Sequence, residues 1–136
     1  MRPSVVLANG CWDLFHPGHL FHLKAAKALG DVLVVSITAD EHVNKGPHRP
    51  VFPQDIRREV IKSLVFVDRT IIVENALEAL RRIRPQIFVK GYDYQNAINP
   101  EHAAYCSKHG IRIAFTNEPT YSSSALLRYY ENRYEA

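Results

Sequence analysis

Short apolar runs alternate along this chain with longer stretches in which apolar and polar residues recur at helical spacing. The runs are rich in Val and Ile, which is typical of strands buried on both faces of a sheet. We predict strands at Ser4–Ala8, Val32–Ile37, Thr70–Val73, Ile87–Val89 and Ile111–Phe115. We predict helices at about 17–29, 54–64, 75–83, 100–109 and 123–133, with Gly30 and Gly110 at helix ends and Asn75 at a helix start.

The alternation of strands and helices predicts an α/β fold. The 136 residues are enough for one good hydrophobic core, and no Ser/Gly-rich tract, long charge block or repeat is present to serve as a linker. We therefore expect residues 1–136 to form a single Rossmann-like domain, a five-stranded parallel sheet with helices on both faces. In such folds, ligands bind beyond the carboxyl ends of the strands.

The connection between the first strand and the first helix has the composition of a phosphate site. It reads Asn9-Gly10-Cys11-Trp12-Asp13-Leu14-Phe15-His16-Pro17-Gly18-His19, and we call residues 9–19 the motif segment. Pro17 suits the first turn of a helix, where no intrahelical N–H bond is lost, and Gly18 lets the backbone approach a ligand. The N–H groups and the positive dipole end of the helix then face any anion above the segment.

The two histidines of the motif segment admit three interpretations. As hydrogen-bond donors, His16 and His19 would stabilise phosphoryl oxygens whose charge grows during transfer. The same residues could instead be an accident of a helix start, or could bind a metal together with His22. Zinc favours Cys or carboxylate ligands beside the histidines, and residues three apart on a helix point in different directions, so we favour the phosphate site.

Two later loops are expected at the same edge of the sheet. The loop at 39–53, here called the Lys45 loop, is long and contains more polar chemistry than a connection needs. Its candidate residues are Asp40, Lys45, Gly46, His48 and Arg49. The segment Lys90-Gly91-Tyr92-Asp93-Tyr94 directly follows the fourth strand, so we expect it near the motif segment, with Lys90 and Asp93 as its best ligand-binding candidates.

Three serines, Ser122-Ser123-Ser124, stand at the start of the last predicted helix. Capping explains one of them. The spare hydroxyl groups and the exposed N–H groups are suited to a second phosphate.

Composition narrows the class of partner. Lys and Arg together number 17 against 14 Asp and Glu, a net charge of +3 spread along the chain, which fits polyanionic small molecules and does not indicate nucleic-acid binding. No apolar run is long enough to cross a bilayer and no N-terminal signal is visible, so we expect a cytoplasmic protein without a membrane partner. The two cysteines, Cys11 and Cys106, are expected to be reduced thiols.

The order of these motifs resembles the cytidylyltransferase-like nucleotidyltransferases. His16-Pro17-Gly18-His19 has the family's H-x-G-H form, and Gly10-Cys11-Trp12-Asp13 resembles its G-x-F-D lead-in with Trp12 in place of Phe. Lys45-Gly46-Pro47-His48-Arg49-Pro50-Val51, followed by Arg57, resembles its K-G-x-x-R-P-V segment and arginine. The residue patterns of this segment and of Val89-Lys90-Gly91-Tyr92-Asp93-Tyr94 are most similar to those of the adenylyltransferase domain of bacterial ADP-heptose synthases. Glycerol-3-phosphate cytidylyltransferase is the nearest rival.

The resemblance implies nucleotidyl transfer from ATP or CTP to a phosphorylated sugar, a heptose 1-phosphate, with release of pyrophosphate; the alternative is transfer from CTP to glycerol 3-phosphate. It implies catalytic roles for His16, His19 and Lys45, Mg²⁺ carried with the nucleoside triphosphate, no metal bound by the protein itself, and a homodimer. The expected nucleotide-contacting residues are Asn9, Gly10, Cys11, Trp12, Asp13, Gly18, Arg57, Lys90, Gly91, Asp93, Ser122, Ser123 and Ser124. A non-catalytic nucleotide-binding module is the alternative from another functional class.

Overall fold

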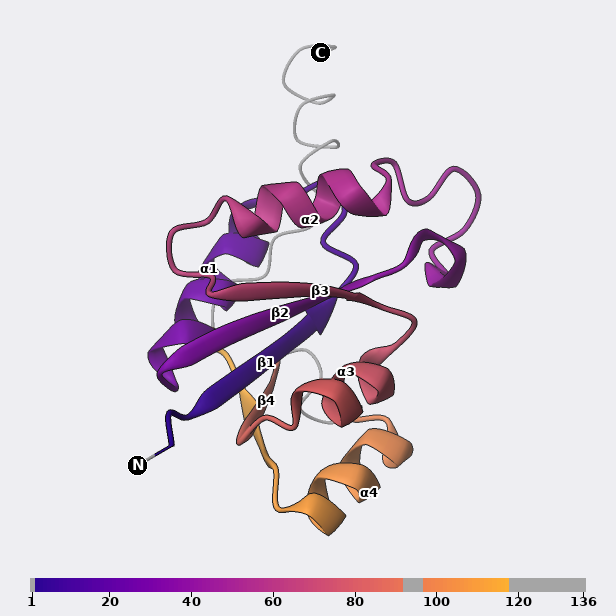
Figure 1. Cartoon of the computed structure of the whole chain (residues 1–136). Coiled ribbons are helices and arrows are strands. Elements are labelled where there is room, and N and C mark those ends of the chain that lie inside the picture. Colours follow the sequence, from indigo (N-terminus) through magenta and orange to yellow (C-terminus); the bar gives the residue numbers. More distant parts are fainter. Residues whose placement is uncertain (1, 92–96, 118–136) are drawn as a thin grey trace.

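The structure is a computed structural model that describes residues 2–91 and 97–117, and it contains the five-stranded parallel sheet that the sequence predicts (Figure 1). The strand order is β3-β2-β1-β4-β5, and each neighbouring pair is parallel. This is an α/β Rossmann-like arrangement. The strands are β1 (Val5–Gly10), β2 (Val32–Thr38), β3 (Arg69–Val73), β4 (Ile87–Lys90) and β5 (Arg112–Phe115).

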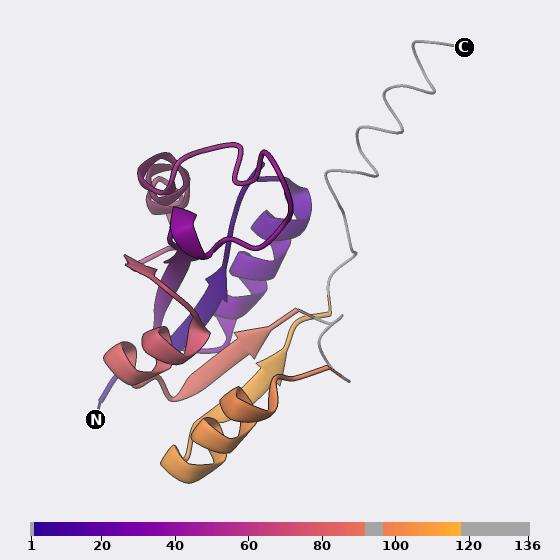
Figure 2. The ribbon, with the colours of Figure 1, turned by 90° about the vertical axis from the view of Figure 1, so that its right-hand side faces the viewer.

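Helices cover both faces of the sheet. They are α1 (Pro17–Ala28), α2 (Gln54–Lys62), α3 (Ala76–Ile83) and α4 (Pro100–His109), with a short 3₁₀ helix, η1 (Asp40–His42). Helices α1 and α2 lie on one face, and α3 and α4 on the other (Figures 1 and 2). Periodicity did not reveal η1, because three residues are too few to show a helical repeat. The helix expected at 123–133 lies outside the described residues.

The central strand β1 explains why the strand sequences are apolar without alternation. Val6 and Ala8 pack toward α1 and α2, whereas Leu7 packs toward α3 and α4, and all three are fully buried. Successive side chains of a strand point to opposite faces, so a sheet covered on both sides needs an apolar residue at nearly every position.

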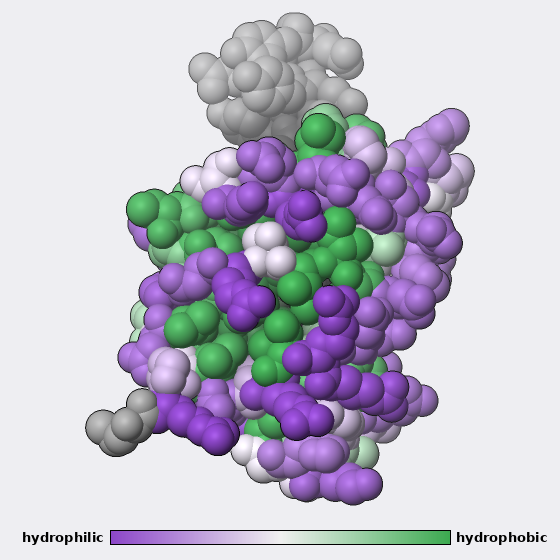
Figure 3. Space-filling model, in the orientation of Figure 1, coloured by the Kyte–Doolittle hydropathy of each residue, from purple (hydrophilic) through white to green (hydrophobic). Residues whose placement is uncertain are grey.

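The edge strand β3 is only partly covered, since Thr70, Ile71 and Ile72 are half-buried. Figure 3 shows hydrophobic side chains on this side of the molecule, framed by hydrophilic residues.

In the parts of the chain that the structure describes, no helix is both long enough and apolar enough to cross a bilayer.

Strand β1 is longer than predicted and enters the motif segment. Asn9 and Gly10 pair in register with Ser36 and Ile37 of β2, so they belong to the strand rather than to the loop, which is confined to residues 11–16. The chain adds β2 and β3 on one side of β1, and then crosses over to add β4 and β5 on the other side. Such a switch point opens a crevice at the carboxyl ends of β1 and β4, where the motif segment lies.

The start of α3 agrees with the sequence. Asn75 is its N-cap residue, and its side-chain oxygen accepts a hydrogen bond from the Glu78 N–H at 2.9 Å. At the end of α4, Gly110 adopts the left-handed conformation with φ 67°, as expected for a terminating glycine. Gly30 follows α1 directly, after the C-cap residue Leu29.

Removing the cap of α3 tests this assignment. Asn75→Ala leaves the Glu78 N–H without its acceptor, so we expect the free energy of unfolding to fall by about 1 kcal/mol, measured by urea denaturation. Asn75→Ser is the control, because it keeps a capping oxygen and should remain near the parent value. Equal losses in both variants would show that capping is not the cause.

Candidate active site

The loop between β1 and α1 is shaped by the packing of Trp12 on Gly10. The Trp12 side chain is buried, its indole N–H donates to the Ser36 carbonyl at 2.9 Å, and its backbone is left-handed with φ 57°. A Cβ atom on Gly10 would lie 2.8 Å from Cε2 of this indole, closer than real contacts allow. Both residues were expected to contact a nucleotide, and the structure shows that they shape the loop.

The structure brings His16 and His19 together. Their rings stack with centroids 3.8 Å apart and planes inclined by 24°. The expectation that these residues point in different directions is wrong, because His16 is the extended N-cap residue of α1 and lies off the helix. The pair is the core of the candidate site.

Hydrogen bonds fix which nitrogen of each ring carries the proton. His16 Nδ1 accepts from the Gly18 N–H at 3.0 Å, and His19 Nδ1 accepts from the His16 N–H at 3.3 Å. A neutral imidazole that accepts at Nδ1 carries its proton on Nε2. The Nε2–H groups are then the donors available to a ligand. The Gly18 N–H was expected to face a phosphate, but in the structure it orients the His16 ring.

Both imidazoles are held neutral. Burial lowers the pKa of His19 to about 4; Lys45 and the protonated forms of His16 and His22 act in the same direction, and Asp13 acts against them. Burial also lowers the pKa of His16, again with a contribution from Lys45. Lys45 is exposed, and its positive charge contributes to the lowered pKa of both rings.

His22 packs against Trp12 and contacts Thr116. Its ring stacks on Trp12 with centroids 6.0 Å apart, and its Nδ1 is 2.8 Å from the Thr116 hydroxyl oxygen. Trp12 in turn meets His19 edge-on. Among the described residues, no group of three His, Cys, Asp or Glu side chains is arranged to hold a metal ion.

Asp13 holds the end of the Lys45 loop. Its buried carboxylate accepts hydrogen bonds from the N–H groups of Val51 at 2.7 Å and Phe52 at 3.1 Å, and from Arg49 Nε at 2.9 Å. Burial alone would raise the pKa of Asp13, but these three partners together lower it, so the carboxylate stays charged. Asp13 was expected among the nucleotide-contacting residues, and in the structure its carboxylate holds the end of the Lys45 loop.

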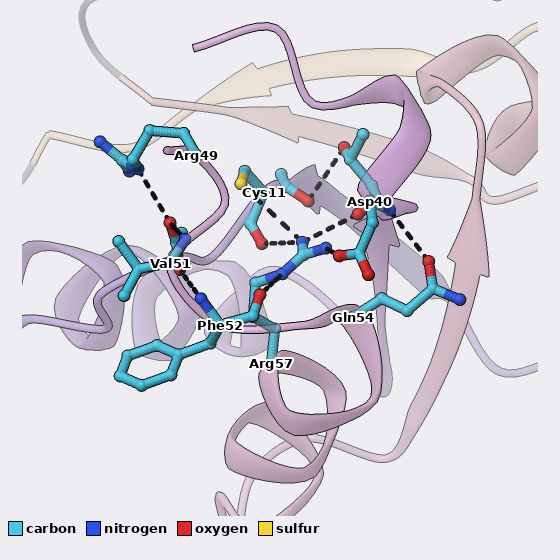
Figure 4. A network of polar contacts seen from close by, with 10 residues as sticks. Cys11, Asp40, Arg49, Val51, Phe52, Gln54 and Arg57 are labelled. Atoms are coloured by element: carbon cyan, nitrogen blue, oxygen red, sulfur yellow. Dashed lines mark hydrogen bonds and ion pairs between the residues drawn. The ribbon is translucent and has the colours of Figure 1, made fainter. Parts of the chain in front are cut away.

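Arg57 was expected to bind phosphate, and the structure gives its guanidinium other partners (Figure 4). The residue is 1% exposed. Nη1 donates to the carbonyls of Cys11 at 2.7 Å and Thr38 at 2.8 Å, Nε donates to the Phe52 carbonyl at 2.9 Å, and Nη2 forms an ion pair with Asp40 at 2.7 Å. A buried guanidinium with these partners presents no face to a triphosphate.

The end of β4 adjoins the motif segment, as expected. Ala8 pairs with Val89, which brings Asn9 next to Lys90 at the carboxyl edge. The Lys90 ammonium lies 5.2 Å from the Phe88 ring centre, and burial lowers its pKa. Gly91 is the first residue after β4. The Asn9 side-chain oxygen accepts a hydrogen bond from the Ser36 hydroxyl. The candidates Asp93, Ser122, Ser123 and Ser124 lie outside the described residues.

Several supporting residues were not assigned a role from the sequence. Asp40 and Arg49 were visible as polar loop residues, but nothing local showed that they pair with Arg57 and Asp13. Ser36, Thr38 and Thr116 gave no signal, because each acts through a partner distant in sequence.

The family model described as cytidylyltransferase-like matches residues 7–128, most of the chain. The chain belongs to the cytidylyltransferase-like family. It is a nucleotidyltransferase, as the sequence predicted.

Relatives of this cytidylyltransferase-like chain carry two different names. A FAD synthase from Aciduliprofundum boonei is 37% identical over 123 residues, which are 89% of this chain and 82% of that protein. The bifunctional protein HldE from Helicobacter pylori is 37% identical over 132 residues, 93% of this chain, although the chain spans only 27% of HldE. The crystal structure of a lipopolysaccharide core biosynthesis protein from Thermoplasma volcanium superposes with a TM-score of 0.75 at 30% identity, covering 88% of this chain and all of that one.

The depressed pKa of His19 predicts how stability depends on pH. The unfolded chain protonates this imidazole near pH 6.5, but the folded protein does so only near pH 4, so the unfolded state binds more protons between these values. Stability should therefore be lost as the pH falls from 6.5 toward 4. We expect the urea midpoint of the parent protein to fall more steeply over this interval than that of His19→Gln. Parallel curves would contradict the assignment.

Proposed function

We propose that this protein transfers the adenylyl group of ATP to the phosphate of a heptose 1-phosphate and releases pyrophosphate. The observation that carries the proposal is the stacked pair His16 and His19, whose hydrogen bonds leave two Nε2–H donors at the switch point of a nucleotidyltransferase fold. The ADP-heptose synthase likeness of the sequence and the match to HldE support the acceptor.

The chemistry requires charge stabilisation rather than a base. An acceptor phosphate is already anionic near neutral pH, so its oxygen attacks the α-phosphorus directly while the bond from the α-phosphorus to the bridging oxygen breaks and pyrophosphate leaves. Charge accumulates on the phosphoryl oxygens as this happens. Neutral Nε2–H donors that are already oriented stabilise that charge without reorganisation, and the nearby Lys45 ammonium neutralises part of it.

Mg²⁺ enters this proposal as part of the substrate. The carboxylate nearest to the histidine pair in sequence is Asp13, and its oxygens are occupied by Arg49, Val51 and Phe52. Mg²⁺ prefers oxygen ligands and retains several waters, so a complex of the ion with the triphosphate suits a site lined by imidazoles and an ammonium.

A second acceptor is favoured by a specific comparison. The A. boonei relative is named FAD synthase, and the matched region covers most of both proteins. Making FAD from FMN is also transfer of an adenylyl group to a phosphate, so the proposed site performs it without changing the roles of His16, His19 or Lys45. Both relatives favour ATP over CTP as the donor.

A pyrophosphate-release screen tests the proposal. We expect release with ATP and a heptose 1-phosphate, and little with CTP, GTP or UTP; FMN and glycerol 3-phosphate are the competing acceptors. Release only with FMN would select the second acceptor, and release only with CTP and glycerol 3-phosphate would overturn adenylyl transfer. Thermal stabilisation by nucleotides without pyrophosphate release from any pair would indicate a non-catalytic binding module.

Variants of the histidine pair test the mechanism. His16→Ala and His19→Ala each remove an Nε2–H donor, so we expect turnover to fall on the order of 100-fold, with little change in the circular dichroism spectrum. His109→Ala is the matched control, because this exposed histidine ends α4 at the opposite edge of the sheet and should leave turnover unchanged. Near-normal turnover in both site variants would refute the assignment.

A further inference from the structure

We propose that Arg57 is a positioning residue for nucleotidyl transfer, which fixes the Lys45 loop against the motif segment and acts on the reaction only through the place of Lys45. The inference rests on the phosphate-neutralising role proposed above for Lys45. It assigns to Arg57 a task other than the phosphate contact that its place in the sequence suggested.

The contacts of Arg57 reach both ends of the Lys45 loop. Thr38 and Asp40, at its start, accept from Nη1 and Nη2, and Phe52, near its end, accepts from Nε (Figure 4). Nη1 also donates to the Cys11 carbonyl of the motif segment. One side chain on α2 therefore ties the start and the end of the Lys45 loop to the loop that carries the histidine pair.

Additional hydrogen bonds strengthen the same two anchors. The Asp40 N–H donates to the Gln54 side chain at 2.9 Å, which holds the start of the loop to the first residue of α2. At the other end, the Asp13 carboxylate holds Arg49, Val51 and Phe52. Both anchors thus consist of buried or half-buried polar contacts.

The part of the loop between the anchors is exposed. Every residue from 44 to 48 is exposed. Gly46 lies at φ 93°, and a Cβ atom placed on it would meet nothing within 4 Å. The position of Lys45 is therefore set by the anchors at the two ends of the loop rather than by contacts of the exposed segment.

Lys45 must stay near the histidines to act on them. Its charge contributes to the lowered pKa of both His16 and His19. A loop released at the Arg57 anchor would carry this ammonium away from the pair while leaving the imidazoles stacked, because their own hydrogen bonds lie within the motif segment.

A double-mutant cycle tests the coupling. The variants are Arg57→Lys, Asp40→Asn and Lys45→Met, assayed for kcat/KM toward ATP with the acceptor that gives pyrophosphate. Because the Asp40 side chain is 40% exposed, Asp40→Asn keeps the test available if the buried Arg57→Lys variant does not fold. Arg58→Lys and Asp55→Asn are the matched controls, since both residues are exposed on α2.

We expect Asp40→Asn and Arg57→Lys each to lower kcat/KM about tenfold in the parent background and less than about twofold when Lys45 is already Met. Losses that add fully in the double variants would overturn the inference. Full activity of Lys45→Met by itself would instead refute the role proposed for Lys45, so the two failures are distinguishable.

Limited proteolysis gives a readout without substrate. Trypsin cleaves after lysine, and exposed loop tips are preferred sites, so the Lys45–Gly46 bond reports how firmly the loop is held. We expect faster cleavage there in Asp40→Asn, assayed well below the melting temperature of the variant, and parent-like cleavage in Asp55→Asn. Unchanged cleavage at this bond, or faster cleavage throughout the chain, would contradict a local anchoring role.

Discussion

Arg57 carries a full positive charge in a position that is 1% exposed. Removing such a charge from water costs several kcal/mol unless it is paired and hydrogen-bonded. Here three main-chain carbonyls and the Asp40 carboxylate supply the compensation. The same contacts fix how the motif segment, the end of β2 and the Lys45 loop lie relative to α2, so burial of one guanidinium organises this edge of the sheet.

Asp13 complements Arg57 with the opposite charge. The two side chains do not pair with each other; each binds main-chain groups, N–H for the carboxylate and C=O for the guanidinium. Main-chain groups in connecting loops have no ladder partners, and burying them unpaired is costly. The two buried charges therefore supply hydrogen-bond partners to main-chain groups of the motif segment and of the Lys45 loop. The same two segments carry the histidine pair and Lys45.

Local patterns revealed the fold because local interactions determine it. Apolar runs marked β1 and β2 within one or two residues, and Asn75 and Gly110 marked helix ends through their own backbone preferences. The candidate site was only partly predictable. The H-x-G-H string located the pair, but stacking of its rings depends on His16 being a cap residue.

The burial of Arg57 could not be seen in the sequence, because its partner Cys11 is 46 residues away. An arginine on a polar helix has the same local appearance whether it faces a phosphate or a set of carbonyls. Only the assembled sheet, which brings the ends of β1 and β2 together beside α2, distinguishes these cases. The structure thus changes the role of a residue whose importance the sequence already indicated.

The way α1 begins has a consequence for substitutions at this edge of the sheet. An imidazole, rather than a hydroxyl or a carboxylate, caps this helix, and the capping bonds themselves choose the tautomer of both rings. The hydrogen bonds that orient both rings run between residues 16 and 19. They involve no residue from another strand or loop. A substitution elsewhere at this edge of the sheet that leaves these residues in place therefore leaves the tautomers of both rings as they are.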